Sequence, residues 1–287
     1  MPAIYWLASY PKSGNTWLRI FLAQLISGRE EPVAINNLPL RIGTAGDRKV
    51  FDRYTGISAA DLTHAQAENL RPALYRELVR HAEEDLYLKI HDAWLPTPDG
   101  QPHTPQEITR GVLYLVRNPL DIVPSFAAHR GIALAESMTA LCNPDFALCK
   151  THHRLHLQLR QRLCDWSGHV SSWLDSGLRC ELLRYEEMVA QPLASFSRAV
   201  ASLGLAYSSE QIARALELCR LEELQRQEQR AGFGEKSTKH ERFFRKGQPG
   251  EWREVLTPAQ VEQILHHHGP TMERLGYYNP ATGVIWP

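Results

Sequence analysis

The chain alternates between short apolar runs and longer stretches in which apolar residues recur every three or four positions. The short runs predict buried strands at residues 4–8, 86–90, 111–116 and 180–184. The helical spacing predicts a helix around residues 18–25 and further helices over residues 64–83, 119–130, 153–175, 192–203, 209–224 and 257–269. Buried strands that alternate with helices are typical of α/β proteins. We therefore expect an α/β fold with a central, mainly parallel sheet flanked by helices.

Four segments lack a clear period and are predicted to be loops. They cover residues 29–63, 96–107, 131–150 and 226–242. No Ser/Gly tract, charge block, repeat or low-complexity stretch marks a linker between domains. The 287 residues are therefore expected to form a single domain, residues 1–287.

Residues 10–17 (Tyr-Pro-Lys-Ser-Gly-Asn-Thr-Trp), here called the N-terminal loop, connect the first strand to the first helix. The first N–H groups of a helix lack backbone partners and lie at the positive end of its dipole, which favours anions. Lys12 adds a positive charge, and Gly14 lets the backbone approach a ligand closely. Ser13 and Thr16 add hydroxyl donors. The loop differs from a P-loop, because its lysine precedes its only glycine, but it still predicts a site for a nucleotide phosphate.

Local signals also mark the starts of two later helices. Asn118 suits an N-cap and Pro119 the first helical position, while Pro124 predicts a kink or an irregular first turn. Thr257 and Gln260 have the spacing of a capping box.

Three basic residues, Lys12, His91 and Arg117, follow predicted strands. Ligands of parallel sheets bind beyond the carboxyl ends of the strands, so these residues are expected to cluster at that edge. An imidazole titrates near neutral pH, which suits a general base. Lys89 lies two residues before His91, so both are expected on one face of the strand.

Composition and charge exclude several classes of function. Lys+Arg and Asp+Glu are both 32, which argues against broad nucleic-acid binding. No apolar stretch approaches the roughly 20 residues of a membrane span, and no signal peptide is evident. The 5 cysteines are an odd number without a C-x-x-C pair, so we expect reduced thiols, no zinc site and a cytoplasmic location. The run 266–268 of histidines lies at a helix end, so no metal site is predicted there.

The N-terminal loop resembles the 5′-phosphosulfate loop of the cytosolic sulfotransferases. That family transfers a sulfuryl group from 3′-phosphoadenylyl sulfate (PAPS) to a hydroxyl or amine and releases PAP. Arg117-Asn118-Pro119, with Ser125 further on, resembles the 3′-phosphate site of the family. Residues 243–252 (Phe-Phe-Arg-Lys-Gly-Gln-Pro-Gly-Glu-Trp), here called the basic loop, resemble its Arg-Lys-Gly-x-x-Gly-Asp-Trp signature. The three motifs occur in the family order and span most of the chain.

The resemblance implies a P-loop-NTPase-like sulfotransferase fold and a role for each matching residue. It makes His91 the general base, Lys89 a contact to the reacting group and Lys12 the cation that stabilises the leaving phosphate. It implies that the nucleotide is bound by residues of the three motifs and by Tyr185, namely Lys12, Ser13, Gly14, Asn15, Thr16, Trp17, Arg117, Ser125, Tyr185, Phe243, Phe244, Arg245, Lys246 and Gly247. Among these, Trp17, Tyr185 and the two phenylalanines are expected around the adenine. No metal is implied, and a membrane anchor of the Golgi type is not expected.

The chain departs from the family pattern at two places. Glu251 stands where the family has aspartate. Arg220 and Leu221 occupy the segment in which the family often has a serine and a phenylalanine that packs on adenine. At Arg220 and Leu221 the resemblance to the adenine-binding residues of the family is therefore weak.

Two other functions remain as alternatives, a P-loop kinase-like phosphotransferase and a non-catalytic PAP-binding protein. The phosphotransferase would need Mg²⁺ and a Walker A arrangement that residues 10–17 do not supply. The partner is expected to be a small hydroxylated acceptor, whose pocket would be built by loops 29–63, 92–110 and 131–152. A phenol, sugar, lipid or natural-product hydroxyl would each fit, and the oligomeric state stays open.

Overall fold

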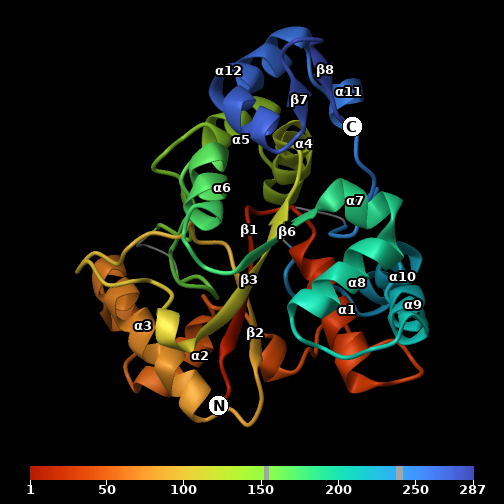
Figure 1. Cartoon of the computed structure of the whole chain (residues 1–287). Helices are drawn as coiled ribbons and strands as arrows, with labels where there is room; N and C mark the ends of the chain where they lie inside the picture. Colours follow the sequence, from red (N-terminus) through yellow and green to blue (C-terminus); the bar gives the residue numbers. More distant parts are fainter. Residues whose placement is uncertain (152–154, 237–241) are drawn as a thin grey trace. The chain divides into compact units, whose positions relative to one another are not determined.

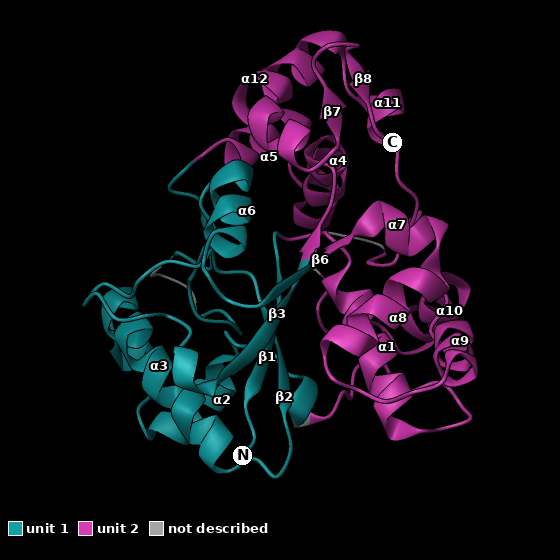
Figure 2. Ribbon diagram, in the orientation of Figure 1, with its two compact units in different colours: residues 1–10, 40–114, 144–181 teal, residues 11–39, 115–143, 182–287 magenta. Residues whose placement is uncertain are grey.

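The computed structural model describes residues 1–151, 155–236 and 242–287 (Figure 1). These residues form two compact units, each assembled from three segments of the chain (Figure 2). Unit 1 consists of residues 1–10, 40–114 and 144–181, and unit 2 of residues 11–39, 115–143 and 182–287. The chain crosses between the two units several times, because each unit consists of three separate segments. The single domain over residues 1–287 stays a prediction.

A four-stranded sheet with the strand order β2-β1-β3-β6 forms the centre of the fold. β1 (Ile4–Ser9) and β2 (Leu86–Ile90) are parallel and buried along their whole length. β3 (Thr109–Val116) and β6 (Cys180–Arg184) each continue from unit 1 into unit 2. Burial on both faces explains the near-continuous apolar runs of β1, β2 and residues 111–116 of β3. β6 was also predicted to be buried, but only its Leu183 is buried and its other residues are partly exposed. The four predicted strands and the α/β class with a parallel sheet flanked by helices are confirmed.

Unit 1 contains β1, β2 and three longer helices. The helices are α2 (Arg48–Thr55), α3 (His64–Arg80) and α6 (Trp166–Leu174). The remaining elements of unit 1 include β4 (Ala147–Leu148), β5 (Gln161–Arg162) and short 3-10 helices at Leu40–Ile42, Ala59–Asp61 and Gln106–Ile108.

Unit 2 is mainly helical. Its elements are α1 (Asn15–Ser27), α4 (Pro119–Arg130), α5 (Leu134–Leu141), α7 (Tyr185–Ala190), α8 (Pro192–Ser202), α9 (Ser209–Leu218), α10 (Leu221–Ala231), α11 (Trp252–Val255), α12 (Pro258–Arg274), β7 (Tyr278–Asn279) and β8 (Val284–Ile285).

The capping signals act as predicted. The Asn118 side chain accepts the N–H of Leu120 at the start of α4, with Pro119 in the first turn. Thr257 and Gln260 form the capping box of α12. α4 continues through Pro124 to its end as one helix.

Two predictions between β3 and β6 were wrong. Residues 131–150 contain a helix, α5, whose Ser137 Oγ donates to the Val123 carbonyl of α4 (2.8 Å), so tertiary packing stabilises a segment with weak local signals. The helix expected over 153–175 begins only at Trp166. Asp165 caps it by accepting the Gly168 N–H, and residues 161–162 form a strand instead. Residues 152–154 lie outside the described residues.

Helix ends were also misplaced elsewhere. The helix expected over 209–224 is two helices, because Arg220 is extended between them. α10 reaches Ala231, inside the loop predicted for 226–242, of which residues 237–241 lie outside the described residues. α12 continues past Gly269 to Arg274, since buried residues such as Met272 hold its last turns in the core. The segment 29–63, predicted to be irregular, contains α2.

Over the described ranges, 1–151, 155–236 and 242–287, no helix is both long and apolar enough to cross a membrane.

Candidate functional site

The N-terminal loop adopts a backbone that favours glycine. Lys12 and Gly14 both have positive φ angles, +73° and +94°. A Cβ atom on Gly14 would lie 2.8 Å from Cδ2 of Tyr185, so both conformation and contact require glycine. α1 begins directly afterwards, at Asn15, and no side chain of the described residues caps its N-terminus. This end of α1 is therefore suited to an external anion.

Two hydroxyls of the N-terminal loop have different surroundings. Ser13 is 1% exposed, and its Oγ has no hydrogen-bond partner within the described part of the chain. A buried hydroxyl without a partner is unfavourable, and a ligand oxygen would satisfy it. Thr16 Oγ1 lies 3.4 Å from the carboxylate of Glu235, which also forms an ion pair with Arg19 (2.7 Å). A carboxylate thus already occupies an anion position beside the first turn of α1.

Arg117, directly after β3, contacts three other segments of unit 2. Its Nη1 donates to the Lys12 carbonyl (3.2 Å) and its Nη2 to the Gln248 carbonyl (3.5 Å). Its guanidinium carbon lies 4.5 Å from the ring centroid of Tyr185. Burial raises the pKa of Tyr185 although Arg117 opposes the shift, so its hydroxyl stays protonated at neutral pH. Arg117 therefore joins the N-terminal loop, α7 and the basic loop.

α4, in unit 2, contains a further predicted residue. Ser125 lies in α4 and is 9% exposed. The start of α4 is fixed by the Asn118 N–H, which donates to Glu186 (2.8 Å). Tyr277 donates its hydroxyl to the other oxygen of Glu186 (2.7 Å). Burial raises the pKa of Glu186, a residue that the sequence reasoning did not single out.

The basic loop is attached to α10 at its start. The N–H groups of Phe243 and Phe244 donate to the carboxylate of Glu228 at 2.6 and 3.0 Å. Gln225 Nε2 donates to the carbonyls of Phe244 and Arg245 at 3.1 and 2.8 Å. Sequence reasoning missed Glu228 and Gln225, because nothing in the polar sequence of α10 distinguishes the buried Glu228 from its exposed neighbours.

α4 holds the other end of the basic loop. The carboxylate of Asp121, a fully buried residue, accepts the N–H of Gly250 (2.6 Å) and the N–H of Trp252 (3.1 Å). Asp121 Oδ2 also lies 3.9 Å from Nη2 of Arg117. Asp121 was not predicted either, and its position one turn after Arg117 was the available signal.

The two cations of the basic loop already have carboxylate neighbours. Arg245 forms an ion pair with Glu251 (2.6 Å), and Lys246 lies 3.4 Å from both Glu251 and Glu254. Interaction with Glu251 raises the pKa of the exposed Lys246 ammonium. A phosphate bound here would therefore compete with Glu251, the residue that departs from the family aspartate.

Gly247 lies against the segment in which the chain departs from the family. Its φ is +65°, and a Cβ atom there would lie 2.7 Å from Cδ2 of Leu221. Leu221 thus packs on the backbone of the basic loop. Arg220 instead forms an exposed ion pair with Glu217 (2.6 Å) at the end of α9.

The predicted aromatic residues form two groups. Trp17 packs edge-on against Phe196 of α8, with ring centroids 4.8 Å apart. Phe243 and Phe244 contact each other (5.1 Å), and the Lys12 ammonium lies 4.2 Å from the centroid of Phe243. The basic loop and the N-terminal loop are therefore in contact through Lys12 as well as through Arg117.

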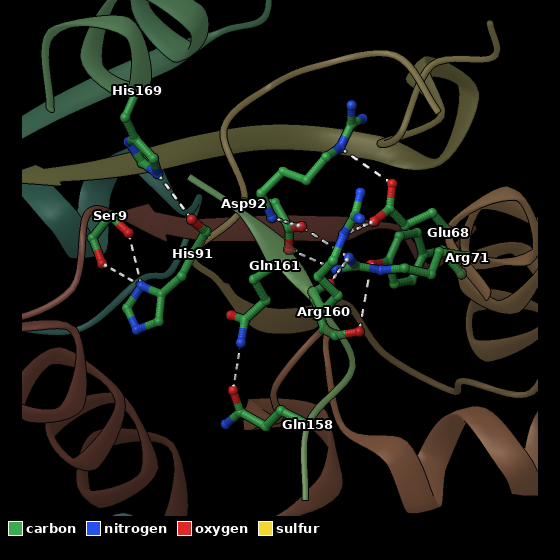
Figure 3. A network of polar contacts seen from close by, with 12 residues as sticks. Ser9, Glu68, Arg71, His91, Asp92, Gln158, Arg160, Gln161 and His169 are labelled. Carbon is green, nitrogen blue, oxygen red and sulfur yellow. Dashed lines mark hydrogen bonds and ion pairs between the residues drawn. The ribbon is translucent and has the colours of Figure 1, made fainter. Parts of the chain in front are cut away.

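His91 belongs to unit 1 and directly follows β2 (Figure 3). It is 9% exposed, and its Nδ1 lies 2.7 Å from the carbonyl oxygen and 3.3 Å from the hydroxyl of Ser9. A carbonyl can only accept a hydrogen bond, so Nδ1 is the protonated nitrogen and Nε2 is the basic one. Lys89 is 6% exposed and pairs with Leu7 of β1.

The structure brings together most, but not all, of the predicted residues. Lys12 and Arg117 meet in unit 2, together with Tyr185 and the basic loop. Since His91 and Lys89 belong to unit 1, their clustering with Lys12 stays a prediction. The described residues contain no group of three or more His, Cys, Asp or Glu side chains that could hold a metal ion.

Comparisons with known proteins identify the family of the chain. The model of the sulfotransferase domain family matches residues 3–276. Cytosolic sulfotransferase 13 of Arabidopsis thaliana is 24% identical over 271 residues, which cover 90% of this chain and 73% of that protein.

Two solved structures share the fold. Mouse sulfotransferase SULT7A1 complexed with PAP has a TM-score of 0.59 at 19% identity and covers 98% of this chain and 86% of its own. Retinol dehydratase in complex with androsterone and the inactive cofactor PAP has a TM-score of 0.62 at 19% identity and covers 97% of this chain and 83% of its own. The chain therefore belongs to the sulfotransferase family, and it is a PAPS-dependent sulfotransferase.

Proposed function

We propose that this chain transfers the sulfuryl group of PAPS to a hydroxyl or amine of a small molecule, with His91 as the general base. The position of Arg117 is the main support for the proposed binding of PAPS. Within unit 2, Arg117 contacts the N-terminal loop, Tyr185 and the basic loop. One buried guanidinium thus organises three segments that the resemblance assigns to one nucleotide. Both solved structures that share the fold are complexes with PAP, which supports this proposal.

The proposed site divides the nucleotide among three sets of residues. Lys12, the Ser13 hydroxyl and the start of α1 (Asn15 and Thr16) bind the 5′-phosphosulfate, and the unsatisfied Ser13 Oγ supports this. Trp17, Tyr185, Phe243 and Phe244 surround the adenine. Arg117, Ser125, Arg245, Lys246 and the Gly247 N–H bind the 3′-phosphate.

The proposed reaction is a single in-line displacement. A bond forms between the acceptor oxygen and sulfur while the bond between sulfur and the phosphate oxygen breaks, and PAP leaves. Nε2 of His91 takes the acceptor proton, because Nδ1 is already protonated toward Ser9. Lys12 stabilises the charge that develops on the leaving oxygen, and Lys89 contacts the reacting group. By analogy with phosphoryl transfer, we expect a loose transition state in which positioning and charge stabilisation dominate.

The acceptor is proposed to be a small hydroxylated compound. A phenol, a sugar, a lipid or a natural-product hydroxyl would each provide the nucleophilic oxygen. We also propose a cytoplasmic location, because the names of the curated relatives describe them as cytosolic.

The function is tested by incubating the chain with ³⁵S-labelled PAPS and a panel of phenols, alcohols, sugars and amines, with and without EDTA. We expect label in one or more acceptors, and equal rates when EDTA is present. Loss of transfer with EDTA would favour a metal-dependent phosphotransferase mechanism instead. Tight PAP binding without transfer to any acceptor would favour a non-catalytic PAP-binding protein.

A further inference from the structure

Buried side chains and a backbone hydrogen bond hold the segment that follows β2. The His91 carbonyl lies 3.0 Å from Nε2 of His169, and the Asp92 carbonyl accepts the indole N–H of Trp173 (2.9 Å). The N–H of Ala93 donates to the Arg162 carbonyl (2.7 Å). His169 and Trp173 both lie in α6 and are fully buried. Three consecutive residues, beginning with the proposed base, are therefore fixed in place.

The ring of His169 has one defined tautomer. The His91 carbonyl can only accept, so Nε2 of His169 must be protonated. Nδ1 of His169 lies 2.7 Å from the Tyr114 hydroxyl, which therefore donates to it. Burial lowers the pKa of His169 to about 4, so the ring is neutral at pH 7 and can form both hydrogen bonds. Tyr114, His169 and the His91 carbonyl thus form a directed chain of hydrogen bonds.

A buried ion pair fixes the next residue (Figure 3). The Asp92 carboxylate forms a bidentate pair with Arg71 of α3 at 3.0 and 2.8 Å, and Arg71 is fully buried. Asp92 also accepts the Arg162 N–H (3.1 Å), and Tyr75 accepts from Arg71 (2.9 Å). Buried ion pairs contribute little net stability, because desolvation offsets their attraction. The bidentate geometry instead fixes the position of the Asp92 side chain.

We propose that Tyr114, His169 and the Arg71–Asp92 pair are positioning residues for the imidazole of His91. The inference rests on the proposed function, in which His91 is the base. Ser9 orients the ring through Nδ1, while the buried groups hold the backbone from which the ring projects. A displacement of about 1 Å at a reacting group can cost about 10² in rate, so a rigid support has catalytic value.

The Tyr114→Phe variant tests the proposal, because it removes one hydroxyl and keeps the ring. Tyr5→Phe is the matched control, since Tyr5 is a buried tyrosine of β1 whose ring stacks on Tyr87, outside the chain of hydrogen bonds. In the long-range ¹H–¹⁵N spectrum of ring-labelled histidines, we expect His91 as the Nδ1–H tautomer and His169 as the Nε2–H tautomer. Tyr114→Phe should shift or broaden the ring signals of both histidines, and Tyr5→Phe should leave them unchanged. An unchanged His91 signal in Tyr114→Phe would overturn the proposal.

A kinetic measurement separates positioning from a merely structural role. With the panel acceptor that gives the highest wild-type rate, Tyr114→Phe should lower kcat about tenfold while the Kd for PAP stays unchanged. In the His91→Ala background, Tyr114→Phe should cause no further loss, because it acts through His91. An undiminished kcat in Tyr114→Phe, with only a lower melting temperature, would contradict the positioning role. Full activity of His91→Ala alone would instead overturn the assignment of the base in the proposed function.

Discussion

The two ring nitrogens of His91 differ in what they can do. Nδ1 faces the Ser9 carbonyl at 2.7 Å and is therefore a donor, which leaves Nε2 as the nitrogen that can accept a proton. This choice depends on a backbone oxygen 82 residues away in the sequence. At this scale the backbone carbonyl of one distant residue decides which ring nitrogen carries the proton.

Replacement of His91 by alanine should affect turnover and spare nucleotide binding. Without a base, kcat should fall by about 10²–10⁴, while the Kd for PAP stays within about twofold of wild type. Transfer of ³⁵S from PAPS and a calorimetric PAP titration measure the two quantities. A variant with the wild-type kcat would remove His91 from the mechanism.

Replacement of Arg117 by alanine should discriminate between two nucleotides. PAP has a 3′-phosphate and adenosine 5′-phosphosulfate does not, so the variant should weaken PAP binding far more than binding of the second ligand. Because Arg117 also donates to the Lys12 carbonyl, a small loss for adenosine 5′-phosphosulfate is expected too. Titration of both nucleotides into wild type and variant gives the comparison. Equal losses for both would contradict the 3′-phosphate assignment.

At the scale of elements, two helices hold the basic loop at its two ends. Glu228 of α10 accepts two N–H groups at the start of the loop, and Asp121 of α4 accepts two near its end. The loop therefore takes its shape from carboxylates outside it. Gly247, between these anchors, packs against Leu221 at the start of α10.

The Glu228→Gln variant tests this anchoring. A neutral amide offers only one oxygen to the two N–H groups, so the loop should lose order and the Kd for PAP should rise about tenfold, the loss expected for a hydrogen bond to a charged group. Glu222→Gln, an exposed residue of the same helix, is the matched control and should leave the Kd unchanged. If both variants bind PAP like wild type, the loop does not depend on α10.

At the scale of the whole molecule, buried histidines make the folded chain sensitive to acid. Burial lowers the pKa of His103 to about 3 and that of His169 to about 4, whereas an unfolded histidine titrates near 6.5. Between these values the unfolded chain binds more protons than the folded one. The free energy of unfolding should therefore fall as the pH decreases from about 6.5 toward 4.

Urea unfolding at pH 7.5 and 5.0 measures this dependence. The midpoint should be lower at pH 5.0 for wild type, and the difference should be smaller for His103→Gln. The exposed His266→Gln is the control and should keep the wild-type difference. Equal differences in all three proteins would show that His103 titrates normally in the folded chain.

Much of the fold could be predicted from local patterns, but element ends and anchors could not. The start of α4 was found because Asn118 and Pro119 act within one helical turn. α5 was missed because its Ser137 is held by a carbonyl of α4, a contact that no short window of sequence contains. Asp121 and Glu228 were missed for the same reason, since their partners lie 129 and 15 residues away.

The sequence alone determined the family through three motifs in the family order, and the α/β class through the alternation of strand and helix patterns along the chain. Each of these patterns could be recognised because it depends on neighbours a few positions apart. The tertiary structure decided which groups meet: Arg117 with the Lys12 carbonyl, Asp121 with the basic loop, and the Ser9 carbonyl with Nδ1 of His91. A hydrogen bond requires its donor and acceptor within about 3 Å and well aligned. Between distant residues, that geometry exists only once the helices and strands of a unit have packed.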